Sequence, residues 1–154
     1  MSDSIRENIL KNIKTTLEGI TIANGCNNDV ASVQRWKKQG NSLRQVSCII
    51  INAGPEEKEL VPNPLFTCRL LVYLDVWTTQ DDNDTTDTDT LLSSLLSDVE
   101  KILMVDYSRG GYAIETTIKG NAPFETIEGE AFAGITIEVE ILYRHQQTDP
   151  SIAG

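Results

Sequence analysis

The sequence has little of what most catalytic and metal-binding sites are built from. It contains a single histidine, His145, and three cysteines without a Cys-x-x-Cys pair, which excludes the common zinc and dithiol motifs. It also has no Gly-x-Ser-x-Gly, Gly-x-x-x-x-Gly-Lys or Gly-x-Gly-x-x-Gly segment, the signatures of a nucleophilic serine, a phosphate-binding loop and a dinucleotide site. The sequence therefore predicts no catalytic residues and no cofactor, and we expect His145 to be a surface residue.

Long hydrophobic runs and secretory features are absent as well. No apolar run approaches the roughly 18 residues that a membrane-spanning helix needs, and the polar N-terminal segment does not resemble a signal peptide. The cysteine count is odd, and Cys48 and Cys68 lie within apolar runs typical of buried strands. We therefore expect a protein made in a reducing cytoplasm, with no membrane partner.

Positive charge is scarce, so that the net charge is −10 and the pI is near 4.5. Residues 1–60 contain 8 Lys and Arg and 7 Asp and Glu, a net charge of +1, whereas residues 61–154 contain 5 and 16, a net charge of −11. A strongly acidic chain repels phosphate backbones and anionic lipid, which argues against tight binding of either. The uneven distribution fits a subunit whose more basic side meets the acidic side of a neighbour.

Two amphipathic helices stand out in the sequence. Ser4 and Glu7 form a capping box, in which the hydroxyl and the carboxylate satisfy free amides at a helix start, and apolar residues follow at helical spacing up to Gly19. This pattern predicts a helix over residues 4–18. A second helix is predicted over 91–103, because apolar residues recur there as a broad stripe.

Much of the remaining chain has the alternation of β-strands. The strongest patterns fall at 66–78 and 133–144, where apolar residues take every second position. We expect no regular structure in the proline-containing connector 53–64 or in a flexible C-terminal tail at 146–154. Weaker patterns predict strands over 20–23, 30–36, 43–52 and 112–119, with a short one within 123–130.

The length of 154 residues and the lack of an internal repeat predict one domain spanning 1–154. Strands and helices occur in the order helix, strands, helix, strands. The simplest arrangement is an α+β fold, with a mixed, mainly antiparallel β-sheet and two helices packed on one face.

An acidic loop precedes the second predicted helix. Five aspartates in this loop could supply oxygen ligands for Ca²⁺ or Mg²⁺, which keeps open a small metal-dependent enzyme. The loop lacks the central glycine and closing glutamate of an EF-hand, so we favour helix capping and a solvated or partner-contacting loop, with no bound metal. The aspartates are Asp81, Asp82, Asp84, Asp87 and Asp89.

Basic and aromatic residues gather at a second place in the sequence. Three interpretations of the basic residues are open: a solvated turn, a contact with an acidic patch on another subunit, or nucleic-acid binding, which the overall charge disfavours. Large aromatic residues are candidate interface anchors, although both tryptophans could instead be core residues. The residues are Arg35, Trp36, Lys37 and Lys38 with Arg44, and the further aromatics are Tyr73 and Trp77.

The order of these patterns resembles the tail terminator (tail completion) proteins of long-tailed bacteriophages, the group typified by the lambda minor tail protein U. Four segments account for this resemblance, which spans nearly the whole chain. They are IRENILKNIKTTLEGI, FTCRLLVYLDVWTT, DTDTLLSSLLSDVEKIL and GITIEVEILYRHQQTDP.

The resemblance implies a structural virion protein and no catalytic residues. Members of this family form hexameric rings on the end of the tail tube, stop its growth and provide a surface for the neck connector, and DNA passes through the ring. On that basis we expect Glu138 and Glu140 to face the lumen. The expected subunit or partner contacts are Arg35, Trp36, Lys37, Lys38, Trp77, Asp81, Asp82 and Asp84. A head-closure or connector adaptor protein of the phage neck is the alternative.

Overall fold

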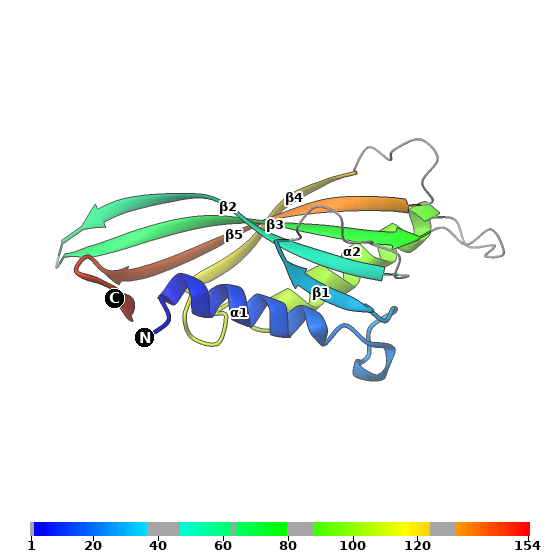
Figure 1. The fold of residues 1–154 in the computed structure, drawn as a ribbon, viewed down its shortest axis with the longest axis horizontal. Helices are drawn as coiled ribbons and strands as arrows, with labels where there is room; N and C mark the ends of the chain where they lie inside the picture. Colours follow the sequence, from blue (N-terminus) through cyan, green and yellow to red (C-terminus); the bar gives the residue numbers. More distant parts are fainter. Residues whose placement is uncertain (1, 37–46, 63, 80–87, 124–131) are drawn as a thin grey trace.

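A computed structural model describes residues 2–36, 47–62, 64–79, 88–123 and 132–154 (Figure 1). Its helices are α1 (Ile5–Glu18), the short 3-10 helix η1 (Ile22–Asn24) and α2 (Thr88–Met104). Its strands are β1 (Ser32–Arg35), β2 (Ser47–Val61), β3 (Leu65–Thr79), β4 (Glu115–Pro123), β5 (Phe132–Gln146) and β6 (Asp149–Ala153).

The strands form a single sheet in the order β1-β2-β3-β5-β4, and β6 pairs with β5. Only the β1–β2 pair is parallel, and the other pairs are antiparallel. The central pair, β3 with β5, runs without a register shift from Leu65 opposite Gln146 to Thr79 opposite Phe132. This continuous ladder is the centre of the fold, because β2, β4 and β6 pair directly with one of its two strands and β1 is attached through β2.

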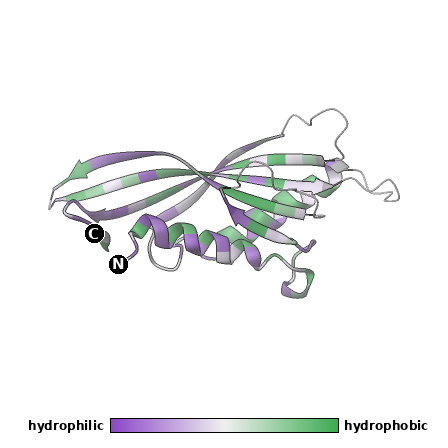
Figure 2. Cartoon of the chain, viewed as in Figure 1, coloured by the Kyte–Doolittle hydropathy of each residue, from purple (hydrophilic) through white to green (hydrophobic). Residues whose placement is uncertain are grey.

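Both helices pack on the same face of this sheet, which confirms the predicted α+β arrangement. Alternate residues of β3 and β5 point to the helices, and the alternation is visible as changing colour along the strands in Figure 2. The core residues on β3 and β5 are Cys68, Leu70, Val72, Leu74, Val76, Ile137, Val139, Ile141 and Tyr143. Burial of these apolar surfaces at about 25 cal/mol per Å² is the main source of stability.

The first helix follows its sequence signals closely. The Glu7 backbone N–H donates to Ser4 Oγ at 3.0 Å, so Ser4 is the predicted N-cap, and the chain turns away at Gly19. The buried stripe of α1 consists of Ile5, Ile9, Leu10, Ile13 and Leu17. The predicted helix at 91–103 is also present and begins slightly earlier, at Thr88.

Two predictions for the first half of the chain were wrong. Residues 20–23 do not form a strand, because η1 occupies Ile22–Asn24. The supposed connector at 53–64 is largely the second half of β2, which continues to Val61. A register shift between Ala53 and Glu56 accommodates Pro55, so the proline interrupts the ladder without ending the strand.

Predictions for the C-terminal part also need correction. Strand β4 begins at Glu115, later than predicted. The Ile114 side chain, which precedes the strand, is exposed. The tail expected to be flexible at 146–154 contains β6, which pairs with β5 through His145 and Gln146. The short strand predicted within 123–130 lies almost entirely outside the described residues.

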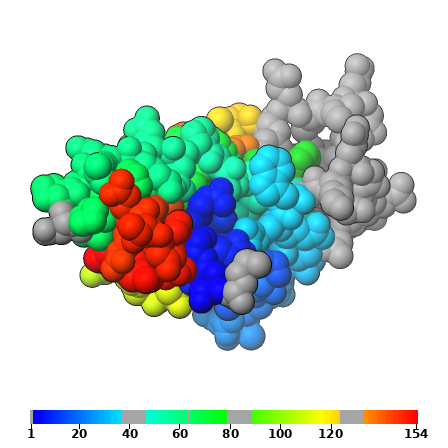
Figure 3. Space-filling view, turned by 60° about the vertical axis from the view of Figure 1, so that its left-hand side comes forward, coloured from blue at the N-terminus to red at the C-terminus, as the bar shows by residue number. Residues whose placement is uncertain are grey.

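The long strands extend beyond the helices at one end of the molecule. In Figure 1, the β2–β3 hairpin and the adjoining part of β5 continue past the start of α1, and β6 folds back near the N-terminal segment. We call the end of the sheet formed by Glu56–Val61, Leu65–Leu70 and Ile141–Gln146 the arm. Figure 3 shows the N-terminal helix, in blue, side by side with the C-terminal segment, in red, next to this arm.

The ring of Tyr73 lies against Gly54 at the β2 register shift. A Cβ atom added to Gly54 would be 2.5 Å from Tyr73 Cε2 and 3.1 Å from the Leu71 carbonyl oxygen. We predict that Gly54→Ala lowers the free energy of unfolding by about 1–3 kcal/mol through overpacking, measured by urea denaturation. Gly120, where an added Cβ meets nothing within 4 Å, is the matched control, and Gly120→Ala should be within about 0.5 kcal/mol of the natural protein. Equal effects of the two substitutions would contradict this account.

Candidate functional site

The face of the sheet opposite the helices has no helix on it among the described residues. It presents a mixture of aromatic, apolar and charged side chains. In the register, Glu138 lies opposite Tyr73 and Glu140 lies opposite Leu71. The β3 residues on this face are Thr67, Arg69, Leu71, Tyr73, Asp75 and Trp77. The alternation predicted for 133–144 is confirmed, and we call this surface the open face.

Glu140 is partly neutralised by a neighbour on the open face. Arg69 Nη1 lies 3.2 Å from Glu140 Oε1, and the Glu140 side chain is 20% exposed against 55% for Arg69. Glu138, two residues before Glu140 on β5, lies on the same face. The lumen position expected for both glutamates remains a prediction, because it concerns an assembly of several chains.

A hydrogen-bonded carboxylate occupies the middle of the open face. Asp75 Oδ2 accepts from Asn52 Nδ2 at 2.9 Å, and Asp75 Oδ1 accepts from the Thr136 hydroxyl at 2.8 Å. Burial raises the pKa of Asp75, and these two hydrogen bonds oppose that rise. The sequence analysis missed this triad, since its members come from three different strands and no local spacing links them.

Trp77 lies on the open face and not in the core between sheet and helices. Its register partners are Cys48 on β2 and Gly134 on β5, and the indole is half-buried. Trp77 therefore adds apolar surface to a face that the helices leave uncovered. Its role as an interface anchor stays a prediction.

Arg35 is the last residue of β1 and Trp36 follows it, and the two side chains lie in different environments. The Arg35 guanidinium forms two hydrogen bonds with the Glu7 carboxylate, at 2.5 and 3.0 Å, which hold the pKa of Glu7 below its usual range. Trp36 is 68% exposed, and its backbone has a φ of +41°. A bulky side chain rarely adopts this left-handed conformation. Lys37, Lys38 and Arg44 lie outside the described residues.

Most aspartates of the predicted acidic loop also lie outside the described residues. Asp81, Asp82, Asp84 and Asp87 fall in the undescribed segment, and Asp89 lies in the first turn of α2 as expected. Within the ranges that the structure covers, no group of three or more His, Cys, Asp or Glu side chains could hold a metal ion. No helix there is long and apolar enough to cross a membrane.

The base of the arm contains a polar cluster around the partly buried Glu56 that the sequence analysis did not identify. The Tyr143 hydroxyl donates to Glu56 Oε1 at 2.9 Å, so β5 and β2 are linked across β3. Arg6 and Lys58 each form an ion pair with the same carboxylate at 3.4 Å. Burial raises the pKa of Tyr143, and the neighbouring Glu56 carboxylate raises it further. Because Glu56 falls in the segment expected to be irregular, its partner could not be predicted.

His145 belongs to the same region and is only 3% exposed, so the prediction of a surface residue was wrong. Its Nδ1 lies 2.7 Å from the Gln146 carbonyl oxygen, and its Nε2 lies 3.0 Å from Lys58 Nζ. A carbonyl only accepts and an ammonium only donates, so these two contacts fit the tautomer with a proton on Nδ1. The rings of Phe66 and Tyr143 cover it, with centroids 5.5 and 6.2 Å away.

The connection between α2 and β4, residues 105–114, holds hydrophobic side chains on an ordered backbone. The Asp106 carboxylate accepts from the backbone N–H groups of Ser108 and Gly110, at 3.0 and 2.8 Å. The fully buried Arg109 guanidinium donates to the carbonyl oxygens of Leu103 and Asp106. The exposed hydrophobic residues in and beside this connection are Met104, Val105, Tyr107, Tyr112 and Ile114.

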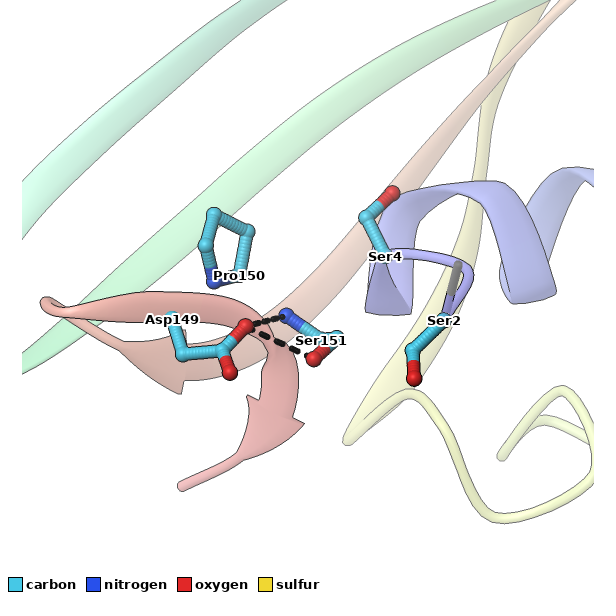
Figure 4. A pocket seen from close by; sticks show the side chains of 5 residues that line it. All are labelled: Ser2, Ser4, Asp149, Pro150 and Ser151. Carbon is cyan, nitrogen blue, oxygen red and sulfur yellow. Dashed lines mark hydrogen bonds between the residues drawn. The ribbon is translucent and has the colours of Figure 1, made fainter.

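A hollow of about 430 Å³ lies where the two ends of the chain meet (Figure 4). Asp149 Oδ1 accepts from the Ser151 hydroxyl and backbone N–H at 2.7 and 2.9 Å, which keeps the pKa of Asp149 below its usual range. Ser4 caps α1 by accepting from the Glu7 backbone N–H. The lining residues are Ser2, Ser4, Asp149, Pro150 and Ser151.

The chain is similar over its whole length to a protein of known structure. That protein is the PVC sheath/tube terminator of an extracellular contractile injection system in the extended state, with 10% sequence identity and a TM-score of 0.48. The chain spans 62% of the length of that protein. No protein-family model and no curated protein matches the sequence. The similarity is remote, and the terminator role stated for that protein is its own.

Two carboxylates should affect stability with opposite dependence on pH. The lowered pKa of Glu7 means that its stabilisation is present above its ordinary pKa of 4.5 and is lost as the pH falls. The raised pKa of Asp75 means that its ionisation opposes folding as the pH rises above its ordinary 3.8. From about pH 4 to 7, Glu7→Gln should become less stable relative to the natural protein, and Asp75→Asn should become more stable. Thermal unfolding across this range tests both, and parallel curves for all three proteins would contradict the assignment.

Proposed function

We propose that this chain is a structural phage virion protein, a tail terminator that forms a ring on the head-proximal end of the tail tube. In this role the ring ends tube polymerisation and provides the surface on which the neck connector docks. DNA passes through the ring without being held tightly. The partners are other copies of the chain, the tail tube protein and a connector protein.

The observation that carries the proposal is a sheet with two unlike margins and one open face. At one margin, β1 pairs only with Cys48–Ile51 of β2, and the rest of that β2 edge has no strand beside it among the described residues. At the other margin, β4 pairs with β5 alone. Unlike surfaces on opposite sides of one subunit allow head-to-tail contacts, and such contacts close into a ring when the rotation between subunits fits.

Surface chemistry supports assembly over catalysis. Large hydrophobic side chains are exposed at Trp36 and along the 104–114 segment, and the described residues gather no catalytic group around the hollow at the chain ends. Interfaces are enriched in exposed aromatic residues and methionine. The sequence resemblance to tail terminators names the assembly that would use these surfaces.

The charge distribution fits the passage of DNA and the contact between subunits. Glu138 and Glu140 on the open face would give the lumen a wall that repels phosphate. The acidic residues Asp81, Asp82 and Asp84 would form a contact surface for a neighbouring subunit or partner. Lys37 and Lys38 would meet acidic side chains of the next subunit, in keeping with the +1 and −11 charges of the two parts of the chain.

Electron microscopy of the purified protein, with and without purified tail tubes, tests the assignment. We expect rings at one end of the tubes and no further addition of tube protein to capped ends. Portal complexes serve as the comparison, because a head-closure or connector adaptor would bind them in preference to tubes. A chain that stays monomeric at high concentration and ignores both tubes and portals would refute a role in the tail.

Reversal of charge on the open face tests the lumen assignment. We predict that replacing Glu138 and Glu140 with lysine leaves ring formation intact and lowers infectivity at least about tenfold, because cationic walls retain DNA phosphate. The control changes Glu18 and Glu100 on the two helices to lysine, which alters the net charge equally on the opposite side of the sheet. Circular dichroism checks that both variants fold. Normal DNA ejection from particles with the open-face variant would exclude the lumen role.

A further inference from the structure

The exposed residues around the end of α2 enclose a hollow of about 320 Å³. Apolar side chains dominate its wall, and one charged group, Glu115, lies at its side. We call it the α2–β4 socket. Its lining residues are Met104, Tyr107, Ile114, Glu115 and Thr116. Three of these five are large hydrophobic residues that remain exposed in the single chain, which is unusual for a surface without a partner.

The socket is held in place by hydrogen bonds on its inner side. The Thr116 hydroxyl donates to the Tyr107 carbonyl oxygen at 2.8 Å, and the Ala113 backbone N–H donates to the Ser108 carbonyl oxygen at 2.8 Å. Buried Arg109 joins the end of α2 to this connection through two carbonyl oxygens. A preformed hollow binds an apolar group without the cost of ordering a loop.

Trp36 is the counterpart on the other margin of the sheet. Its indole is the most exposed aromatic side chain of the described residues, yet its backbone is fixed, because its N–H donates to the Ile51 carbonyl oxygen at 3.1 Å. The left-handed backbone at φ +41° costs energy for a bulky residue and is retained where a side chain must be presented in one direction. Figure 3 shows the segment that ends at residue 36, in cyan, on the surface beside the blue helix.

Trp36 cannot reach the socket of its own chain. Trp36 follows β1 at one edge of the sheet, whereas the socket leads into β4 at the other edge, with β2, β3 and β5 between them. On the helix side, α1 separates them: Arg35 is bound to Glu7, whereas Gly110 lies beside Asn12. A contact between Trp36 and the socket therefore requires two chains.

We propose that the α2–β4 socket receives Trp36 of a second copy of this chain. Each copy then offers one projecting indole and one hollow on opposite margins, which is the arrangement that a head-to-tail contact needs. An aromatic anchor in a preformed pocket is the common form of an interface hot spot. The charges agree, because Trp36 belongs to the part of the chain with net charge +1 and the socket to the part with −11. This inference rests on the proposed ring and names the contact that closes it.

Cysteine cross-linking between two different variants tests the contact directly. Trp36→Cys is prepared in one batch and Ile114→Cys in another, both with Cys26→Ser, because Cys26 is the one native cysteine that is not fully buried. Mixed, assembled on tail tubes and oxidised, the two variants should form a disulfide between residues 36 and 114, identified by mass spectrometry of the linked peptides. Neither variant alone should give this cross-link.

Assembly measurements supply a second readout. Trp36→Ala and Ile114→Ser should each weaken ring formation at least about tenfold in sedimentation, as expected for a hot spot, and the double variant should be little worse than either. Ile22→Ser, which removes another exposed hydrophobic side chain on η1, is the control and should assemble normally.

The outcomes separate this contact from the proposed function. Rings that cap tubes, without the cross-link and with Trp36→Ala assembling normally, would overturn the contact and leave the function standing. Intact rings that no longer bind tubes when Ile114 is changed would assign the socket to the tube protein and overturn the contact equally. If the natural protein assembles under no condition, the proposed function fails and the contact fails with it.

Discussion

The unbroken pairing of β3 with β5 is the constraint on which the rest of the structure depends. Fifteen residues of each strand face each other without a register shift, so a single alternation decides which side chains meet the helices and which remain on the open face. A slip of β5 by one residue against β3 would exchange the two sets of its side chains, exposing Ile137 and burying Glu138. Both the core and the charged surface therefore follow from one register.

Features that repeat with a regular period were predictable from the sequence. The stripe of α1 and the alternation along β3 and β5 place the core correctly, because burial on one side enforces a period. The end of β2 was predicted wrongly because a proline can have two roles in a strand. A proline usually marks the end of a strand, but Pro55 lies at a register shift within β2, so the part of the strand beyond Ala53 was missed.

The candidate sites show a similar division. The polar face of β5 could be predicted from spacing alone, whereas the Asp75 triad and the Glu56–Tyr143 hydrogen bond join residues that are distant in sequence. His145 was expected at the surface because a lone histidine is more often a surface residue than a base or ligand, yet it is buried beside Phe66 on the adjacent strand. Contacts across a sheet depend on the register between strands, which no local sequence pattern predicts.

The register shifts have a consequence for the shape of any assembly. They occur in β2 between Ala53 and Glu56, in β4 between Ile118 and Gly120, and between β5 and β6, but not in the central pair. Bulges bend and twist the strand that contains them. All of these bends lie outside the central pair. An insertion or deletion at any of them would change the curvature of the sheet while leaving the β3–β5 ladder in register.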